Sequence, residues 1–232
     1  MTTKRHSASA VGYADNILVA GGTDDKSDDI DIVEVCNGHH WTKAQCLPKP
    51  YHDMKSTIFN GHWYLMGGWK QRKEVYYVSL NSLVVSSEKT VHVSSMWKRL
   101  TDVPHERSSP AVFGNRLIAV GGGEISIPNS SIHAYSPHTQ SWLHVGDMPV
   151  ELIYTCTAVL TTGELMVIGG WSWNDAKPYV YQSCVYQASL NGNESVTCKE
   201  HKSQHKATTN CIIVSRPPPA CQIDYRLKFF II

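Results

Sequence analysis

Cysteine and histidine side chains near the carboxyl end of the chain have a spacing suited to metal chemistry. Zinc binds thiolate sulfur and imidazole nitrogen, and Cys198, His201, His205 and Cys211 contain two ligands of each type. They lie in a polar segment unlike the rest of the chain, and no second group of this kind supports them. Short motifs often match by chance, so we expect no metal at this place.

A second group of such side chains surrounds a tryptophan near the amino end. Cys36, His39, His40 and Cys46 flank Trp41. Adjacent residues of a strand point to opposite faces of the sheet, so the two histidines are poorly placed to share a metal ion. We interpret this stretch as a turn followed by the start of a strand.

Sequence motifs for nucleotide or acyl chemistry are missing. The chain contains no nucleophile elbow, P-loop or dinucleotide-binding fingerprint. A triple glycine, residues 121–123, follows an apolar run, but residues 124–128 do not begin a helix that could hold a phosphate. The sequence therefore predicts neither a cofactor nor an enzymatic activity.

Four double glycines organise the chain. Each follows an apolar run, and they are Gly21-Gly22, Gly67-Gly68, Gly121-Gly122 and Gly169-Gly170. The intervals between them are 46, 54 and 48 residues, and self-similarity at such a period is typical of repeat architectures. A backbone that leaves an inner strand in a crowded place needs a positive φ and no side chain, which explains the glycines. We therefore expect function to belong to the surface of the assembled units.

The units share further features that predict β-structure. Three contain a tryptophan with a proline seven residues later, at Trp41, Trp97 and Trp142. Stretches rich in β-branched and aromatic residues predict four short strands per unit, which in the third unit are 110–113, 117–120, 131–135 and 142–145. Residues 59–62 and 113–116 predict tight turns between the first two strands. No long segment has apolar residues at helical spacing, so we predict an all-β fold.

This pattern resembles the kelch repeat family, whose units contain an apolar run, Gly-Gly, an aromatic or apolar residue shortly before a tryptophan, and then proline. Tyr135 before Trp142 fits well. The resemblance covers residues 1 to about 190 and implies a β-propeller of four-stranded antiparallel blades. It also implies structural roles for the eight paired glycines, the three tryptophans and Tyr135.

The resemblance divides the chain into units at approximately residues 5–48, 49–104, 105–149 and 150–190. The fourth unit has no tryptophan near residue 190, so we expect it to lack its outer strand. Residues 191–232 have no kelch pattern and include three consecutive prolines, so we expect an irregular or disordered tail. We accordingly predict an incomplete kelch-type propeller of about four blades.

Composition bears on partners and compartment. The formal net charge is +1, from 21 lysine and arginine and 20 aspartate and glutamate residues, so nothing favours nucleic acid or an anionic membrane. No apolar stretch reaches the roughly 18 residues of a membrane span, and the amino terminus lacks the apolar region of a signal peptide. Seven cysteines without a framework spacing fit reduced thiols. We expect a cytoplasmic protein.

Candidate binding residues lie in the loops after the double glycines and between the units. The first such loop is acidic, the second basic, and the fourth contains two tryptophans. In kelch proteins the corresponding loops form the usual partner-binding face, and Trp and Arg dominate interface energetics. We expect a protein partner to contact Lys70, Arg72, Trp171, Trp173, Asp24, Asp25, Tyr51, His52 and Arg107. The alternative is that these residues form ordinary solvated turns, or that Trp171 packs on its own blade.

The sequence thus predicts a protein-interaction module that binds a partner of unknown identity through one propeller face, in a substrate-recognition or scaffold role. The kelch family includes substrate-recognition subunits of cullin ubiquitin ligases and actin-associated proteins, but no BTB domain accompanies the repeats here. One alternative is an enzyme on the same scaffold, either similar to galactose oxidase or otherwise metal-dependent. Tyr154 and Cys156 are close in sequence, but no histidine pair matches them. Another alternative is a truncated, non-functional propeller fragment.

Overall fold

The computed structural model describes residues 1–69, 73–82, 97–160, 163–174, 177–181, 185–190 and 196–201. Regular structure in these residues is β-strand apart from one short 3-10 helix, Leu80–Ser82. The prediction of an all-β fold is therefore confirmed. None of the described residues forms a helix with the length and apolar character needed to cross a membrane.

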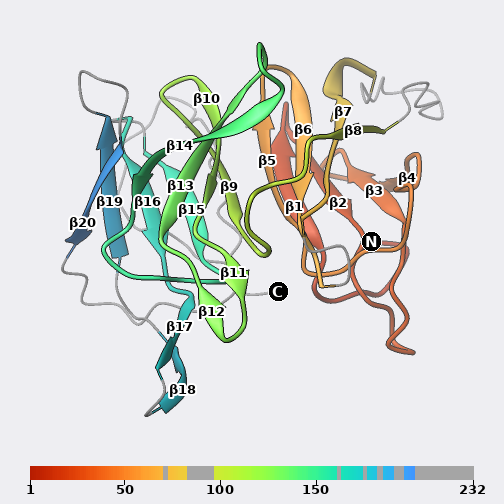
Figure 1. Ribbon diagram of the computed structural model, residues 1–232. Helices are drawn as coiled ribbons and strands as arrows, with labels where there is room; N and C mark the ends of the chain where they lie inside the picture. The colour runs from red at the N-terminus through yellow and green to blue at the C-terminus, as the bar shows by residue number, and fades with distance from the viewer. Residues whose placement is uncertain are drawn as a thin grey trace, which may run out of the picture.

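The larger sheets are two four-stranded antiparallel sheets and one eight-stranded sheet, in which a parallel pairing of β14 with β20 joins two four-stranded antiparallel halves. We call the two four-stranded sheets and the two halves blades 1 to 4 (Figure 1). Blade 1 contains β1 (Ser9–Tyr13), β2 (Asn16–Ala20), β3 (Val33–Cys36) and β4 (Trp41–Lys43). Blade 2 contains β5 (Lys55–Phe59), β6 (His62–Met66), β7 (Val75–Ser79) and β8 (Lys98–Leu100). Blade 3 contains β9 (Ser109–Phe113), β10 (Arg116–Val120), β13 (Ser131–Ser136) and β14 (Ser141–Asp147). Blade 4 contains β15 (Cys156–Val159), β16 (Leu165–Ile168), β19 (Val185–Leu190) and β20 (Val196–His201).

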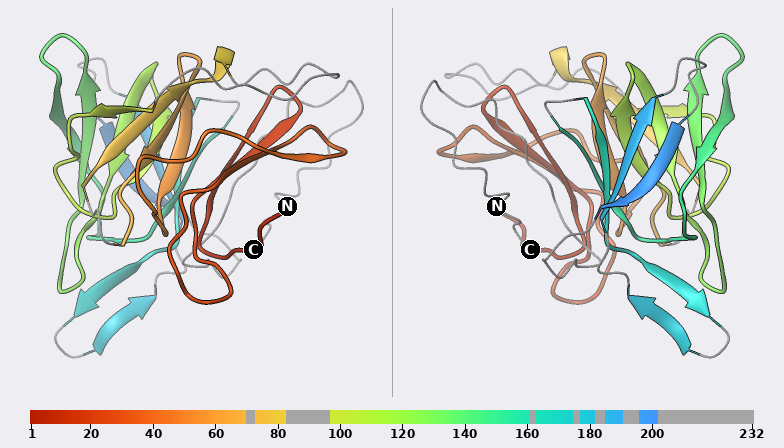
Figure 2. Two further views of the ribbon diagram at one scale, coloured as in Figure 1. Left: turned by 90° about the vertical axis from the view of Figure 1, so that its right-hand side faces the viewer. Right: turned by 90° about the vertical axis from the view of Figure 1, so that its left-hand side faces the viewer.

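Two short hairpins extend from one end of blades 3 and 4. They are β11 (Gly123–Glu124) with β12 (Ile127–Pro128), and β17 (Trp171–Asn174) with β18 (Lys177–Tyr181). Figure 2 shows the second hairpin projecting below the sheets in both views. Each hairpin follows the double glycine of its blade directly.

The turns between the first two strands of blades 2 and 3 are as predicted. Gly114 and Asn115 have φ of 57° and 56°, and Asn60 and Gly61 have φ of 46° and 69°. Two successive residues with positive φ are the signature of the tight hairpin turn that matches strand twist. The four strands predicted for the third unit also agree with β9, β10, β13 and β14 to within two residues.

The double glycines adopt the same backbone conformation in every blade, since all eight residues have a positive φ. At Gly122 (φ of 100°) a Cβ atom would lie 2.7 Å from Ser108 Oγ and 2.8 Å from Ser108 N. The Gly122 N–H donates to the carbonyl of Leu152, which leads into blade 4, at 2.8 Å, and Gly22 donates to Tyr51, which leads into blade 2, at 2.7 Å. In blades 1 and 3 the second glycine of the pair therefore links its blade to the next one in the chain.

Apolar clusters fill the three interfaces between successive blades. Leu18, Ala20, Val33 and Val35 of blade 1 pack against Trp63 and Leu65 of blade 2. Met66 and Val75 on the other face of blade 2 pack against Leu117 and Ala119 of blade 3. Ile118 and Val120 on the opposite face of blade 3 pack against Leu165 and Val167 of blade 4. Strands β6 and β10 are thus apolar on both faces, as continuous apolar runs predict.

First strands of successive blades are neighbours, so the blades form an ordered series. Ser9 Oγ of β1 donates to Ser56 Oγ of β5 at 2.7 Å, and Thr157 Oγ1 of β15 donates to the Pro110 carbonyl of β9 at 2.6 Å. Strands β5 and β9 are also in contact. Among the described residues, no strand pairing joins β15 to β1 to close a ring.

Blade 4 corrects the expectation that the fourth unit lacks an outer strand. β20 pairs with β19 from Leu190↔Val196 to Val185↔His201, although residues 191–232 were expected to form an irregular tail. β20 also pairs in parallel with β14 of blade 3, through Gly146↔Val196 and Asp147↔Thr197. The blade therefore extends past residue 190, because pairing on both sides stabilises a strand that has no tryptophan. Residues 202–232 lie outside the described residues.

The cysteines correct a second expectation. Cys36 and Cys46 are free, in agreement with reduced thiols. Cys156, at the beginning of β15, is disulfide-bonded, so the expectation of reduced cysteines fails at this position.

Candidate functional site

The chain enters all four blades by the same turn. Ser7, Asp53, Arg107 and Tyr154 lie just before the first strand of their blade and have φ of 53°, 58°, 56° and 57°. Few residues other than glycine adopt such a φ, so its recurrence shows that one backbone geometry is repeated. We call these segments (residues 5–8, 51–54, 105–108 and 152–155) the lead-in turns.

The residue after each double glycine is bound to the lead-in turn of its own blade. The N–H groups of Thr23, Trp69, Gly123 and Trp171 donate to the carbonyls of His6, His52, Glu106 and Ile153, at 2.9, 3.1, 2.6 and 3.0 Å. Lead-in turns and post-glycine segments therefore lie together at one end of the molecule. In Figure 1 this is the lower end, where both short hairpins and the loop between β2 and β3 extend.

Arg107 is the most extensively bound side chain at this end. Its Nη1 lies 2.7 Å from Glu106 Oε2 and 3.2 Å from the Gly123 carbonyl, and its Nε donates to the Tyr154 hydroxyl at 2.9 Å. The guanidinium carbon lies 5.6 Å from the centre of the Trp69 ring and 5.8 Å from that of Tyr154. These distances are in the range of cation–π attraction.

The two rings next to Arg107, Trp69 and Tyr154, are each stacked on a further ring. Trp69 is stacked with His52, with ring centres 6.3 Å apart, and His52 Nδ1 lies 2.7 Å from Asp29 Oδ1. On the other side, Tyr154 is stacked on Trp171, with ring centres 5.7 Å apart and planes inclined by 9°. We call Asp29, His52, Trp69, Arg107, Tyr154 and Trp171 the mouth cluster. Its members come from all four blades.

Charge within the mouth cluster is largely compensated. The Arg107 side chain is only 3% exposed and forms an ion pair with Glu106. It therefore holds neighbouring side chains in position from inside the protein. The His52 imidazole is close to the carboxylates of Asp29 and Asp53. Trp69 is 44% exposed, so its indole presents the largest apolar surface of the cluster to solvent. Because the Arg107 charge is neutralised by Glu106, the cluster is poorly suited to bind a free anion. The exposed Trp69 ring is better suited to apolar contact.

The structure brings together three of the residues predicted to bind a partner. His52, Arg107 and Trp171 belong to the mouth cluster, although Arg107 is buried. Asp24 and Asp25 lie in the neighbouring loop between β2 and β3, where Asp24 Oδ1 accepts hydrogen bonds from the N–H groups of Lys26 and Asp28. Lys70 and Arg72 lie outside the described residues. Trp173 lies in β17, and its side chain is outside the described part of the structure.

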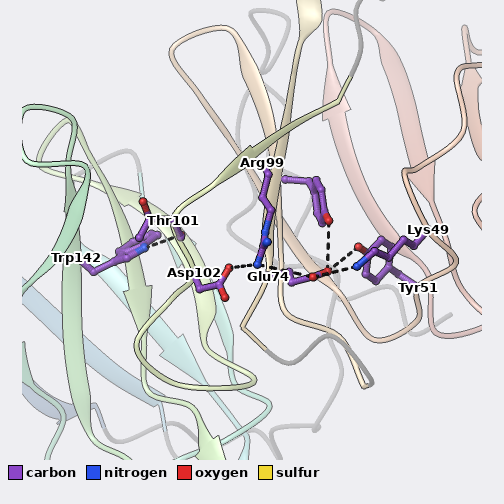
Figure 3. Close-up of polar contacts among 8 residues, drawn as sticks. Lys49, Tyr51, Glu74, Arg99, Thr101, Asp102 and Trp142 are labelled. Atoms are coloured by element: carbon purple, nitrogen blue, oxygen red, sulfur yellow. Dashed lines mark hydrogen bonds and ion pairs between the residues drawn. The ribbon is translucent and has the colours of Figure 1, made fainter.

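The prediction that Tyr51 contacts a partner at the surface is wrong. It is 1% exposed, and its hydroxyl donates to Glu74 Oε2 at 2.8 Å (Figure 3). Lys49 and Arg99 lie near the same carboxylate, at 3.2 and 3.8 Å. Burial tends to raise the pKa of Glu74, but the hydrogen bonds from Tyr51 and Lys49 and the charges of Lys49 and Arg99 lower it overall. Tyr51 is therefore part of the interior of the molecule.

Sequence reasoning missed Asp29, Trp69, Tyr154 and Glu106. A signal for Trp69 was present, since it directly follows a double glycine, as the predicted residue Trp171 does. Alignment of the lead-in turns would also have placed Tyr154 at the same position as Arg107. The contacts between blades that join these residues could not be read from any single unit.

Of the two groups of candidate metal ligands from the sequence, only Cys36, His39, His40 and Cys46 have described side chains, and they do not form a metal site. Among the described residues, no three His, Cys, Asp or Glu side chains converge to hold a metal ion. Cys198 and His201 lie in β20, whereas His205 and Cys211 lie outside the described residues. His39 and His40 occupy the turn before β4, with ring centres 6.5 Å apart.

Comparison with known proteins supports the fold. No protein-family model matches the chain, and no curated protein matches it. The solved structure of YjhT, a kelch-type β-propeller protein, is similar to this chain with a TM-score of 0.67 and 14% sequence identity, over 90% of this chain and 69% of that one. At this identity the likeness concerns fold alone. Together with the four blades, it shows that this chain is an all-β protein of β-propeller architecture.

Proposed function

We propose that this chain is a kelch-type propeller segment that binds a protein partner through the mouth cluster and the loops around it. The observation that carries the proposal is that side chains from four blades form one connected set of rings and ion pairs, whose most exposed ring is Trp69. A substrate-recognition or scaffold role is consistent with such a surface.

The composition of the mouth cluster supports protein recognition. Trp, Tyr and Arg are the residue types that dominate binding energy at protein interfaces. Here the rings are stacked on one another, and Arg107 is fixed by Glu106 and Tyr154. A surface that is rigid before binding loses little side-chain freedom when the partner arrives.

The geometry does not favour the galactose-oxidase-like alternative. Such a site needs Tyr, Cys and His side chains that converge near the centre. The Tyr154 hydroxyl is instead engaged by Arg107, and Cys156 is in a disulfide.

Site-specific photo-crosslinking tests the proposal. In the test protein a photoreactive amino acid replaces Ile127, which is 68% exposed in hairpin β11–β12, at the end of the molecule where the mouth cluster lies. In the control protein it replaces Asn115, in the exposed turn between β9 and β10. We expect protein crosslinks from position 127 and few from position 115. Excess unlabelled wild-type protein should compete for the crosslink, and a Trp69→Ala, Trp171→Ala variant should compete poorly. Equal crosslinking from both positions, or equal competition by the variant, would contradict the proposal.

A further inference from the structure

Three histidines lie close together on blade 3, outside the mouth cluster. His133 of β13 and His144 of β14 are cross-strand partners, with ring centres 5.5 Å apart and planes inclined by 72°. His105, in the lead-in turn of the same blade, has its ring centre 5.5 Å from that of His133. The sequence separations of these residues do not suggest a motif.

The two paired rings are each oriented through one nitrogen. His144 Nε2 lies 3.1 Å from Asp147 Oδ2, and His133 Nδ1 lies 3.3 Å from Ser131 Oγ. The other nitrogens, His133 Nε2 and His144 Nδ1, form no hydrogen bond within the described part of the chain. Histidines that bind metals typically have this arrangement, in which a carboxylate or another polar group holds the nitrogen remote from the metal.

The separation of the rings fits a shared metal ion. Two imidazoles bound to one Zn²⁺ by bonds of about 2.1 Å, at a tetrahedral angle, have ring centres roughly 5 Å apart. The observed separation of 5.5 Å is close to this value. His144 and Asp147 are 53% and 54% exposed, so an ion can reach the pair from solvent.

We propose that His133 and His144 form a surface chelate for a divalent transition metal ion of the zinc, nickel and copper class. Because no three metal-binding side chains of the described residues converge, the protein supplies two nitrogen ligands and water fills the remaining positions. Asp147 acts as a positioning residue that fixes the His144 ring. This site is independent of the mouth cluster and of partner binding.

Calorimetric titration with Ni²⁺ tests the proposal, since imidazole is a preferred ligand of this ion. We expect the wild-type protein to bind Ni²⁺ and not Mg²⁺, which prefers oxygen ligands. His144→Gln, at an exposed position, should weaken Ni²⁺ binding at least about tenfold, and Asp147→Asn by about tenfold, as for other groups that orient ligands. A His39→Gln, His40→Gln variant removes another exposed histidine pair and should bind Ni²⁺ like the wild type.

Two results would overturn the proposal. One is the absence of Ni²⁺ binding to the wild-type protein, and the other is an unchanged affinity in His144→Gln. Far-ultraviolet circular dichroism and the melting temperature without metal show whether each variant is folded. Loss of binding in a folded His144→Gln protein, with binding retained in the His39→Gln, His40→Gln control, supports it.

Discussion

The indole nitrogen of Trp142 donates a hydrogen bond to the backbone carbonyl of Thr101 at 3.1 Å, and Thr101 follows the outer strand of the preceding blade. Trp97 makes the equivalent contact with the Gln45 carbonyl at 3.5 Å. In both cases the acceptor lies four residues after the tryptophan of the preceding unit. The repeated tryptophan thus packs within its own blade and also binds the blade before it. Trp41, in the first blade, forms no such bond within the described residues.

Replacing Trp142 by Phe should therefore cost more stability than the same change at Trp41. Trp142→Phe retains most apolar contact with Tyr135 but removes the donor to Thr101, so we expect a loss of about 1 kcal/mol in the free energy of unfolding. Trp41→Phe serves as the control, because no comparable hydrogen bond is lost. Urea unfolding followed by circular dichroism measures both, and equal losses would contradict a role for the hydrogen bond.

The double glycines should tolerate no side chain, and Gly122 provides a direct test. Gly122→Ala combines an unfavourable φ of 100° with collision against Ser108, so we expect a loss of about 2–5 kcal/mol. Gly38 has φ of 91° and no atom within 4 Å of a Cβ, so Gly38→Ala should cost only about 1 kcal/mol. The difference between the two variants isolates the crowding at Gly122, and similar losses would show that crowding has no effect there.

Removing only the Arg107 charge should cost more stability than removing both charges of the Arg107–Glu106 ion pair. The two side chains are 3% and 13% exposed, so Arg107→Met leaves a carboxylate in a poorly solvated place, at a cost of about 3 kcal/mol. The double variant Arg107→Met, Glu106→Gln removes both charges and should recover part of this loss. A double-mutant cycle on unfolding free energies measures the coupling. If the double variant is as unstable as the sum of its parts, the ion pair contributes no coupling.

His133 should make the protein less stable in mild acid. Because its pKa in the folded protein is about 4, against an ordinary value of 6.5, the unfolded chain binds the proton more readily between these two pH values. Stability is therefore lost as the pH falls from about 6.5 to about 4, and this residue causes no further loss below that range.

A non-titrating residue at position 133 should reduce this acid sensitivity. His133→Gln should lose less stability than the wild type between pH 7 and pH 4, by on the order of 1 kcal/mol once solvent screening at a half-buried site is allowed for. His138→Gln, in the exposed turn between β13 and β14, is the matched control. Melting temperatures measured across this pH range decide the outcome, and parallel curves for wild type and His133→Gln would refute the assignment.

Much of the fold could be predicted from sequence because its determinants are local. A double glycine requires a positive φ, Phe-Gly-Asn-Arg at 113–116 forms a tight turn wherever it flanks two strands, and apolar runs such as 117–120 suit strands buried on both faces. These requirements recur in each unit and predicted the first three blades. The outer strand of blade 4 was missed because β20 depends on pairing with β14, more than forty residues away in the chain.

The candidate site, like the fold, was predicted only in part from the sequence. Loop position alone predicted His52, Arg107 and Trp171 as members of one end of the molecule. It could not separate His52 from its neighbour Tyr51, although one stacks on Trp69 and the other is buried beside Glu74. Sequence alone determined the repeated units, because each unit contains the signals for its own turns and strands. Only the tertiary structure decided which loop side chains meet, because the mouth cluster forms where the ends of four separate blades pack together.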